Sequence, residues 1–401
     1  MKGNNSKIAI LVMTLLVSSV LCGCISDGDV SGQEEVAEFK TVVDMRGVEV
    51  TVPTDPQRVI DISRGLVDEV MYIFGNDEII VGGSFSQSAL TEGQYMWNGV
   101  DYTVNTYISK CLMPRLNDSE EVTNVGGFGG PYGGVPNVET ILSLAPDLVI
   151  LRDFGGDDEN TINFIQLVEE TGIPVVVLKY PDCFDVASPD TIYEEIRVLG
   201  EVFGDEDKAS EIIAMLKERV DMIEERTATL EESERKSVLF FGAPTWASDK
   251  GGVGVTFGSG TIEVAFLEAI INAESAYSDS GRNLVSAEQV LSMDPDVILL
   301  PTWSGYHAPR QLYEEAYDSI SDLRAIQDNE VYSLATTPVN SQRLEFPINL
   351  MIAAKSTYPE LFTDIDIEAW ISDFLKELYG VDDELCDEMM DALMLEYLEI
   401  I

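Results

Sequence analysis

A pattern of apolar and polar positions occurs twice in the chain, 149 residues apart. Residues 138–151 (VETILSLAPDLVIL) return as residues 287–300 (AEQVLSMDPDVILL), with Glu, Leu, Ser, Pro, Asp and the final Leu in register. Each copy follows an N-cap residue, Asn137 or Ser286, and consists of a short amphipathic helix, a Pro-Asp stop and an apolar run. Because the runs are continuously apolar, we expect strands that are covered on both faces, as in a parallel α/β sheet. The repeat predicts two similar lobes.

Further elements of both lobes follow from the same kind of pattern. In the first half, alternation predicts a hairpin over 42–52, strands over 58–63, 78–84 and 174–178, and helices over 66–74 and 159–171. In the second half we expect strands over 237–241 and 331–334, and helices over 261–271, 346–356, 367–379 and from 383 to the end. Residues 87–122 follow neither period and are interpreted as an insertion.

Two strongly helical segments separate the halves. They cover 189–203 and 205–232, and the second contains neither Gly nor Pro. Its 28 residues would form a rod of about 42 Å, long enough to hold two lobes apart. We therefore expect an N-terminal β/α lobe over 41–188, a helical connector over 189–235 and a C-terminal β/α lobe with terminal helices over 236–401.

The first residues have the pattern of an export signal. Lys2 and Lys7 precede the apolar stretch 8–21, which spans about 21 Å as a helix and is too short for a hydrocarbon core of about 30 Å. The ending Leu-Cys-Gly-Cys resembles a lipobox, so we expect residues 1–23 to be a lipoprotein signal peptide and Cys24 to carry the lipid. Residues 24–40 would be a tether. The alternative is a plain secretory signal that leaves Cys24 unmodified.

Charge and cysteine content narrow the class of protein. Asp and Glu number 72 against 24 Lys and Arg, a formal net charge of -48, which disfavours nucleic acid and anionic lipid surfaces as partners. We interpret the acidity as solvation in a salty exterior. Cys111, Cys183 and Cys386 form no Cys-x-x-Cys pair, so no zinc or iron-sulfur site is indicated. Cys111 and Cys183 are candidates for a disulfide in an exported protein.

Common enzyme motifs are missing from the sequence. His307 is the one histidine, which rules out a histidine cluster and leaves any Ser-His-Asp arrangement to that residue. Gly-x-Ser-x-Gly does not occur, and the glycine runs at 126–134 and 251–260 match neither nucleotide-binding fingerprint. We therefore expect a binding protein without a catalytic site or a resident cofactor.

Scarce cations and large aromatic residues follow the predicted strands, where ligands of open α/β sheets bind. Arginine offers a fixed fork of donors to ligand oxygens, and aromatic rings offer flat contact area. For each arginine an ion pair with a nearby carboxylate explains the residue equally well. The candidate ligand-binding residues are Arg64, Arg152, Trp246, Trp303, Tyr306, His307 and Arg343.

The order of these segments resembles one protein family. The segments Arg58-Val59-Ile60, Val125-Gly126-Gly127, the two repeats and the long helix from Asp205 are similar to the ABC importer substrate-binding proteins for ferric siderophores, haem and cobalamin. The resemblance covers about 58–380. It implies two lobes with mainly parallel central sheets, one long backbone helix and a ligand cleft between the lobes. In that family one glutamate on each lobe docks onto arginines of the permease, and Glu139 and Glu288 match these positions. The alternative is that each glutamate only favours its helix N-terminus.

The resulting functional hypothesis is a lipid-anchored receptor at the outer face of the cytoplasmic membrane. It would act as a monomer that captures an iron complex of the ferric siderophore type and delivers it to permease subunits with their ATPase. A single histidine favours a preformed metal chelate over a bare transition metal. The alternatives are a corrinoid or haem as the ligand, and an exported chelatase-like enzyme that uses His307 as acid or base.

Overall fold

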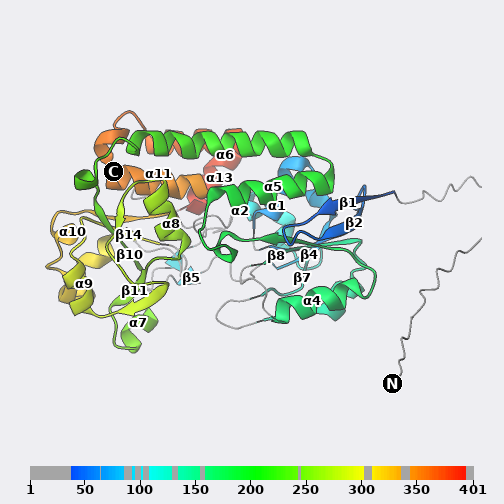
Figure 1. The fold of residues 1–401 in the computed structure, drawn as a ribbon, viewed down its shortest axis with the longest axis horizontal. Helices are drawn as coiled ribbons and strands as arrows, with labels where there is room; N and C mark the ends of the chain where they lie inside the picture. Colours follow the sequence, from blue (N-terminus) through cyan, green and yellow to red (C-terminus); the bar gives the residue numbers. More distant parts are fainter. Residues whose placement is uncertain are drawn as a thin grey trace, which may run out of the picture. The chain divides into compact units, whose positions relative to one another are not determined.

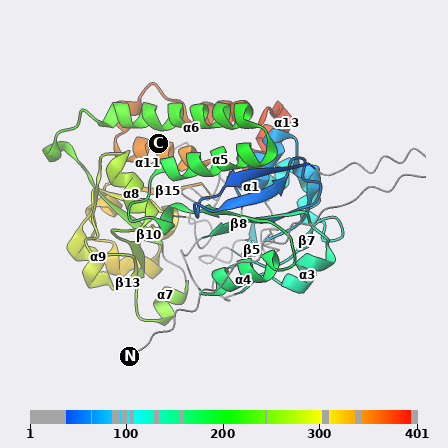
Figure 2. The same ribbon diagram turned by 45° about the vertical axis from the view of Figure 1, so that its right-hand side comes forward.

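The computed structural model describes residues 38–393, apart from 64, 85–92, 95–100, 103–107, 129–133, 154–158, 243–244, 302–308 and 336–343. The chain begins there with an antiparallel hairpin of β1 (Phe39–Val43) and β2 (Glu49–Pro53), as the alternation predicts. Strand β1 starts inside the segment that the sequence assigns to a tether. Figure 2 shows the hairpin beside α5 (Pro189–Phe203), with which β1 is in contact.

The first lobe is built on a parallel five-stranded sheet in the order β7-β4-β3-β8-β9. Alternate residues of β8 face two different hydrophobic clusters. Leu148 and Ile150 belong to one cluster and Val149 and Leu151 to the other, which confirms that the apolar run of the first repeat is covered on both faces. The strands are β3 (Val59–Ile62), β4 (Ile80–Gly83), β7 (Thr123–Asn124), β8 (Leu148–Asp153) and β9 (Val175–Lys179).

Helices cover both faces of this sheet. Helix α1 (Val67–Phe74) and α5 contribute to the first cluster, whereas α3 (Val138–Ser143) and α4 (Glu159–Glu169) contribute to the second. Figure 1 shows α5 above the strands and α4 below them. The lobe therefore has the three-layer arrangement that the sequence predicts.

The second lobe has a six-stranded sheet that mixes both strand directions. Strands β10 (Ser237–Gly242), β14 (Val297–Leu300) and β15 (Val331–Ser333) are parallel, and β12 (Glu274–Ser275) pairs in parallel with β10. Strands β11 (Gly254–Phe257) and β13 (Arg282–Val285) continue the sheet in antiparallel register. The composition of the glycine-rich stretch 251–260 suggests a turn, but part of this stretch, Gly254–Phe257, forms strand β11.

Gly254 explains why this stretch can form a strand. A Cβ atom at this position would lie 2.4 Å from Cε2 of Phe241 and 2.9 Å from the carbonyl oxygen of Gly242. Glycine is therefore required where β11 passes the ring of Phe241 in the neighbouring strand. The helix and strand of the second repeat, α9 (Ala287–Met293) and β14, fold as predicted, and so does the preceding helix α8 (Ile262–Ala269).

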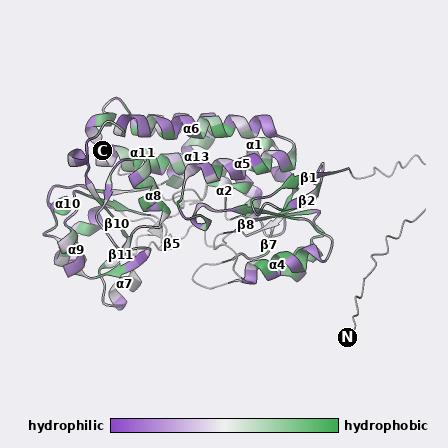
Figure 3. Ribbon diagram, in the orientation of Figure 1, coloured by the Kyte–Doolittle hydropathy of each residue, from purple (hydrophilic) through white to green (hydrophobic). Residues whose placement is uncertain are grey.

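A layer of helices joins the lobes. Its long member α6 spans Glu206–Thr227, 22 residues or about 33 Å, which is shorter than the predicted 28 residues. The helix ends at Thr227, whose carbonyl oxygen accepts a hydrogen bond from Nδ2 of Asn272 at 2.9 Å. Figure 3 shows hydrophilic residues along α6, in agreement with its mostly charged outer positions.

The C-terminal helices pack against both lobes. Helices α11 (Phe346–Thr357), α12 (Ile367–Tyr379) and α13 (Asp383–Leu393) share one hydrophobic cluster with strands of both sheets. Helix α13 contacts α2 (Ile108–Leu112), which belongs to the predicted insertion at 87–122. The rings of Tyr72 and Tyr379 lie 6.3 Å apart, and Glu69 Oε2 accepts a hydrogen bond from the Leu344 N–H at 3.0 Å. The lobes thus touch at several points besides α6.

Candidate functional site

The carboxyl ends of the parallel strands lie at one edge of each sheet. In the first lobe β3 and β8 run side by side, with Ile62 opposite Leu151. In the second lobe β10 and β14 are parallel neighbours, with Phe240 opposite Leu299. Because ligands of open α/β sheets bind beyond such edges, each lobe has one edge at which ligand contacts are expected.

Most of the predicted ligand-binding residues fall outside the described residues: Arg64, Trp303, Tyr306, His307 and Arg343. Trp246 lies in α7 (Thr245–Asp249), directly after β10, and its side chain also falls outside them. Two of these residues come shortly after the carboxyl end of a described strand. Strand β3 ends two positions before Arg64, and β14 ends three positions before Trp303. The ligand role of these residues stays a prediction.

Arg152 lies on β8 and its side chain is fully buried. Its Nε and Nη2 atoms each donate to one carboxylate oxygen of Glu195 on α5, both at 2.6 Å, and its guanidinium lies 4.9 Å from the ring centre of Tyr180. The alternative to a ligand role, a local ion pair with a carboxylate, is therefore present for this arginine. The pair joins the sheet to the helical layer. Because the guanidinium of Arg152 is fully buried, it presents no exposed donor to a ligand, and the structure does not support a ligand role for this residue.

Glu195 was not predicted as a functional or structural partner. Its side chain is also fully buried, and burial raises the pKa of this carboxyl while the guanidinium of Arg152 acts in the opposite direction. The polar pattern of α5 gave no signal for it, because the helix carries several other acidic residues that face solvent.

The two predicted docking glutamates have matching local structures. Glu139 lies in the first turn of α3 and Glu288 in the first turn of α9, and both side chains are exposed. The N-cap residue Asn137 accepts a hydrogen bond from the Thr140 N–H at 2.9 Å, and Ser286 accepts one from the Gln289 N–H at 3.3 Å. The two short helices thus present a carboxylate in the same way.

The aspartates of the two Pro-Asp stops also have matching structural roles, which the sequence pattern did not predict. Asp147 accepts hydrogen bonds from the Gln57 and Arg58 N–H groups, and Asp296 accepts one from the Ser237 N–H at 2.9 Å. Each aspartate therefore fixes the strand that runs beside its own. The duplicated Asp after Pro was the available signal.

Two further features bear on where a ligand or metal could bind. A pocket of about 260 Å³ in the second lobe is lined by Tyr313, Asp318 and Asn329, among others. Asn329 precedes the amino end of β15, so this pocket lies at the edge opposite to the expected ligand contacts. In the part of the chain that the structure describes, no group of three or more His, Cys, Asp or Glu residues is placed to hold a metal ion.

The sequence leaves open whether Cys111 and Cys183 form a disulfide, and the structure contains no bond between them. Sγ of Cys183 donates instead to the carbonyl oxygen of Asp153 at 3.2 Å. Cys111 lies on α2, which packs against α13, so its burial serves the hydrophobic cluster.

A family model described as periplasmic binding protein matches residues 108–337, more than half of the chain. The chain belongs to this family. Members of the family include substrate-binding proteins of ABC transporters. Such proteins bind small ligands outside the cytoplasm and work with permease and ATPase subunits. Among the described residues, no helix combines the length and apolar character needed to cross a bilayer.

Three relatives illustrate the range of the family. The ABC transporter substrate-binding lipoprotein YvrC of Bacillus subtilis is 24% identical over 87% of this chain and 96% of its own length. The Fe(3+)-citrate-binding protein YfmC of the same organism is 21% identical over 82% of this chain and 95% of its own. The molybdate-binding protein MolA of Haemophilus influenzae is 23% identical over 61% of this chain and 70% of its own.

Solved structures agree with the two-lobed fold. The structure of MolA covers 86% of this chain and 98% of its own chain, with a TM-score of 0.64 and 17% identity. The overall arrangement predicted from the repeat, two α/β lobes with central sheets, is therefore confirmed for this periplasmic binding protein.

Proposed function

We propose that this periplasmic binding protein captures an iron complex of the ferric siderophore type and delivers it to an ABC permease. The observation that carries the proposal is the single histidine of the chain, His307. A bare transition metal is usually held by several imidazoles, whereas a preformed chelate brings its own ligands and needs donors and flat surfaces from the protein.

The predicted ligand-binding residues fit such a chelate. Arg64 and Arg343 would donate to carboxylate or catecholate oxygens, and Trp246, Trp303 and Tyr306 would contact the organic framework. The likeness to a protein named for binding ferric citrate supports an iron complex. The likeness to a molybdate-binding protein makes a small oxyanion the alternative that a test must include. Haem and corrinoids are further ligands that large aromatic residues would suit.

The proposal includes a membrane anchor. Residues 1–23 would be removed, Cys24 would carry the lipid, and the segment up to residue 40 would tether the lobes to the outer face of the cytoplasmic membrane. The likeness to YvrC, which is named a lipoprotein, supports this part. Mass spectrometry of the mature protein should find diacylglycerol on an N-terminal Cys24, and a chain that starts at another residue would contradict the anchor.

Docking on the permease would use Glu139 and Glu288. Their support is the matching exposure of both carboxylates in the first turns of α3 and α9. An exposed carboxylate on each lobe can pair with a basic group on each half of a two-fold permease.

Tryptophan fluorescence tests the ligand directly. The protein without its first 24 residues is titrated with ferric siderophores, ferric citrate, haem, cobalamin and molybdate, and a saturable change is expected with a ferric siderophore. The variant Trp303→Phe should lose much of the change, whereas Trp370→Phe, which alters a tryptophan that stacks on Phe374 in α12, should keep it. Saturation only with molybdate, or a flat response to all ligands, would contradict the proposal.

A further inference from the structure

Exposed apolar side chains accompany both docking glutamates. Leu142 is 39% exposed and Leu291 is 37% exposed, and each lies three residues after Glu139 or Glu288 on the same helix. Residues three apart lie on one helix face, so each glutamate has an exposed leucine beside it.

A second apolar pair repeats with the same spacing. Val135 is 50% exposed and Leu284 is 38% exposed, and each lies two residues before the N-cap of its helix. Of the twelve large hydrophobic side chains that are exposed in the described part of the chain, four therefore occupy these matched positions. A single exposed leucine needs no explanation, but four at equivalent places of two lobes do.

The packing of the repeats does not require these side chains. The same helices bury Ile141 and Val290, which are 0% exposed and belong to the hydrophobic clusters of their lobes. The buried and the exposed apolar positions thus alternate within each short helix in the same way in both lobes. We call the exposed sets, Val135, Glu139 and Leu142 with Leu284, Glu288 and Leu291, the paired faces.

We propose that the paired faces form one bipartite docking surface in which the leucines and Val135 supply apolar contact around each glutamate. The partner is an integral membrane protein with two equivalent halves, each of which presents a basic side chain bordered by apolar side chains. This inference rests on the proposed function and specifies its docking partner.

Charge decides between the possible occupants. A second copy of this chain would place glutamate against glutamate, and an anionic lipid surface would be repelled by a chain with a formal net charge of -48. A partner with a basic centre on each half satisfies both carboxylates, and the repetition on two lobes matches a two-fold surface.

The acidity of the chain fits a salty exterior, and high salt is a reason for apolar contact at the docking surface. In about 1 M salt the Debye length falls to about 3 Å, so ion pairs at an open interface contribute little. Apolar contacts persist under these conditions, and kosmotropic salts strengthen them. The paired faces therefore allow docking in a salty exterior that would weaken two isolated ion pairs.

Photo-crosslinking in native membranes tests the surface. A photoreactive residue is placed at position 142 or 291 of the full chain, and positions 43 and 48 serve as controls because Val43 and Val48 are exposed apolar residues of the β1–β2 hairpin. We expect positions 142 and 291 to crosslink to the same polytopic membrane protein, identified by mass spectrometry, and the control positions to give no such product.

The affinity for that membrane protein, purified in nanodiscs with its ATPase, gives the second readout. L142S/L291S should bind it about 25-fold more weakly than the wild type, about fivefold for each leucine, while V43S/V48S should bind normally. Unchanged ligand titrations and unfolding midpoints would exclude a folding defect.

Two results separate this inference from the proposed function. If L142S/L291S docks like the wild type while E139R/E288R does not, the apolar part of the surface is refuted and the docking glutamates stand. If neither variant changes docking and no crosslink forms at 142 or 291, the paired faces are refuted altogether, while the ligand titration still decides whether the chain is a receptor.

Discussion

At the scale of single residues, Arg152 and Glu195 form a buried ion pair that joins β8 to α5 in the first lobe. Both side chains are fully buried, so removal of one partner leaves a charge in the interior. Arg152→Met should lower the free energy of unfolding by about 3 to 5 kcal/mol, measured by urea denaturation. R152M/E195M should recover much of this loss.

Arg197 on α5, the helix that carries Glu195, provides the matched control. It pairs with Glu194 and Glu201 on the surface, where such pairs contribute about 0 to 1 kcal/mol. Arg197→Met should therefore be almost neutral. An effect of Arg152→Met no larger than that of Arg197→Met would contradict the assignment of Arg152 to a buried structural pair.

Asp364 gives a residue-scale prediction about pH. The guanidinium of Arg226 donates two hydrogen bonds to this carboxylate and lowers its pKa to about 2 from the usual value near 4. Because the folded-state pKa is lowered, the stabilisation is present above about pH 4 and is lost as the pH falls toward 2.

Asp364→Asn should flatten the dependence of unfolding free energy on pH in this window. The control is Asp55→Asn, since Asp55 is exposed in the loop between β2 and β3. Equal slopes for both variants between pH 4 and 2 would show that the pair with Arg226 does not contribute.

At the scale of elements, the sequence predicts most helices and the parallel strands, because the apolar pattern of each runs over several residues and the helix caps are chemically distinct. The end of α6 could not be predicted, because its last residue, Thr227, contacts Asn272, which lies 45 residues further along the chain in the second lobe. Strand β11 was missed because its glycines mimic a turn. Which carboxylate pairs with Arg152 was also unpredictable, since the contact depends on how α5 packs on β8.

Gly254 provides the prediction for this element. Gly254→Ala would press a methyl group onto the ring of Phe241 and the backbone of Gly242, so we expect a loss of about 1 to 3 kcal/mol in unfolding free energy. The variant G254A/F241L should recover part of this loss because the ring is removed. A neutral Gly254→Ala would show that β11 and β10 do not approach as closely as described.

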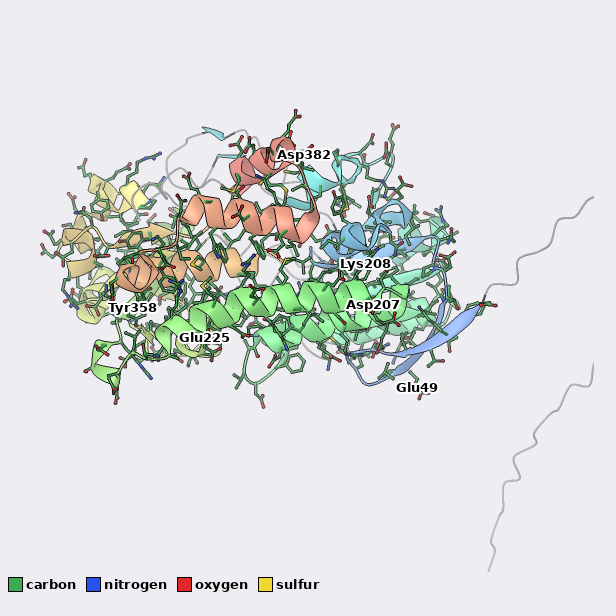
Figure 4. All side chains as sticks on the ribbon, turned by 90° about the horizontal axis from the view of Figure 1, so that it is seen from above. Glu49, Asp207, Lys208, Glu225, Tyr358 and Asp382 are labelled. Atoms are coloured by element: carbon green, nitrogen blue, oxygen red, sulfur yellow. The ribbon has the colours of Figure 1, made fainter. Side chains whose placement is uncertain are left out.

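At the scale of the whole molecule, charge dominates. Figure 4 labels exposed acidic residues on the helical layer, Asp207 and Glu225 on α6 and Asp382 beside α13. With a formal net charge of -48, self-repulsion should be strong in dilute buffer and weak in high salt. The thermal unfolding midpoint should therefore rise by several degrees between 0.01 and 1 M NaCl. Sucrose at matched osmolality controls for solvent exclusion, and an equal rise in sucrose would argue against screening.

The candidate site illustrates the limit of sequence reasoning at this scale. The repeat predicts both lobes, both short helices and the matching positions of Glu139 and Glu288, because each is encoded locally. The predicted ligand-binding residues follow different strands of both lobes, so their arrangement depends on how the lobes pack and is not encoded locally. The exposure of Leu142 and Leu291 could likewise not be predicted, because it depends on Ile141 and Val290 being the side chains that fill the core.

Uptake of a radiolabelled ferric chelate tests the central claim that this chain is a delivery protein. The chelate is the one that saturates the fluorescence response, and cells carry the wild type, E139R/E288R, or the charge-matched control E49R/E225R on the hairpin and α6. We expect E139R/E288R to abolish uptake while its ligand affinity stays unchanged, and E49R/E225R to transport normally. Normal uptake by E139R/E288R would contradict the account.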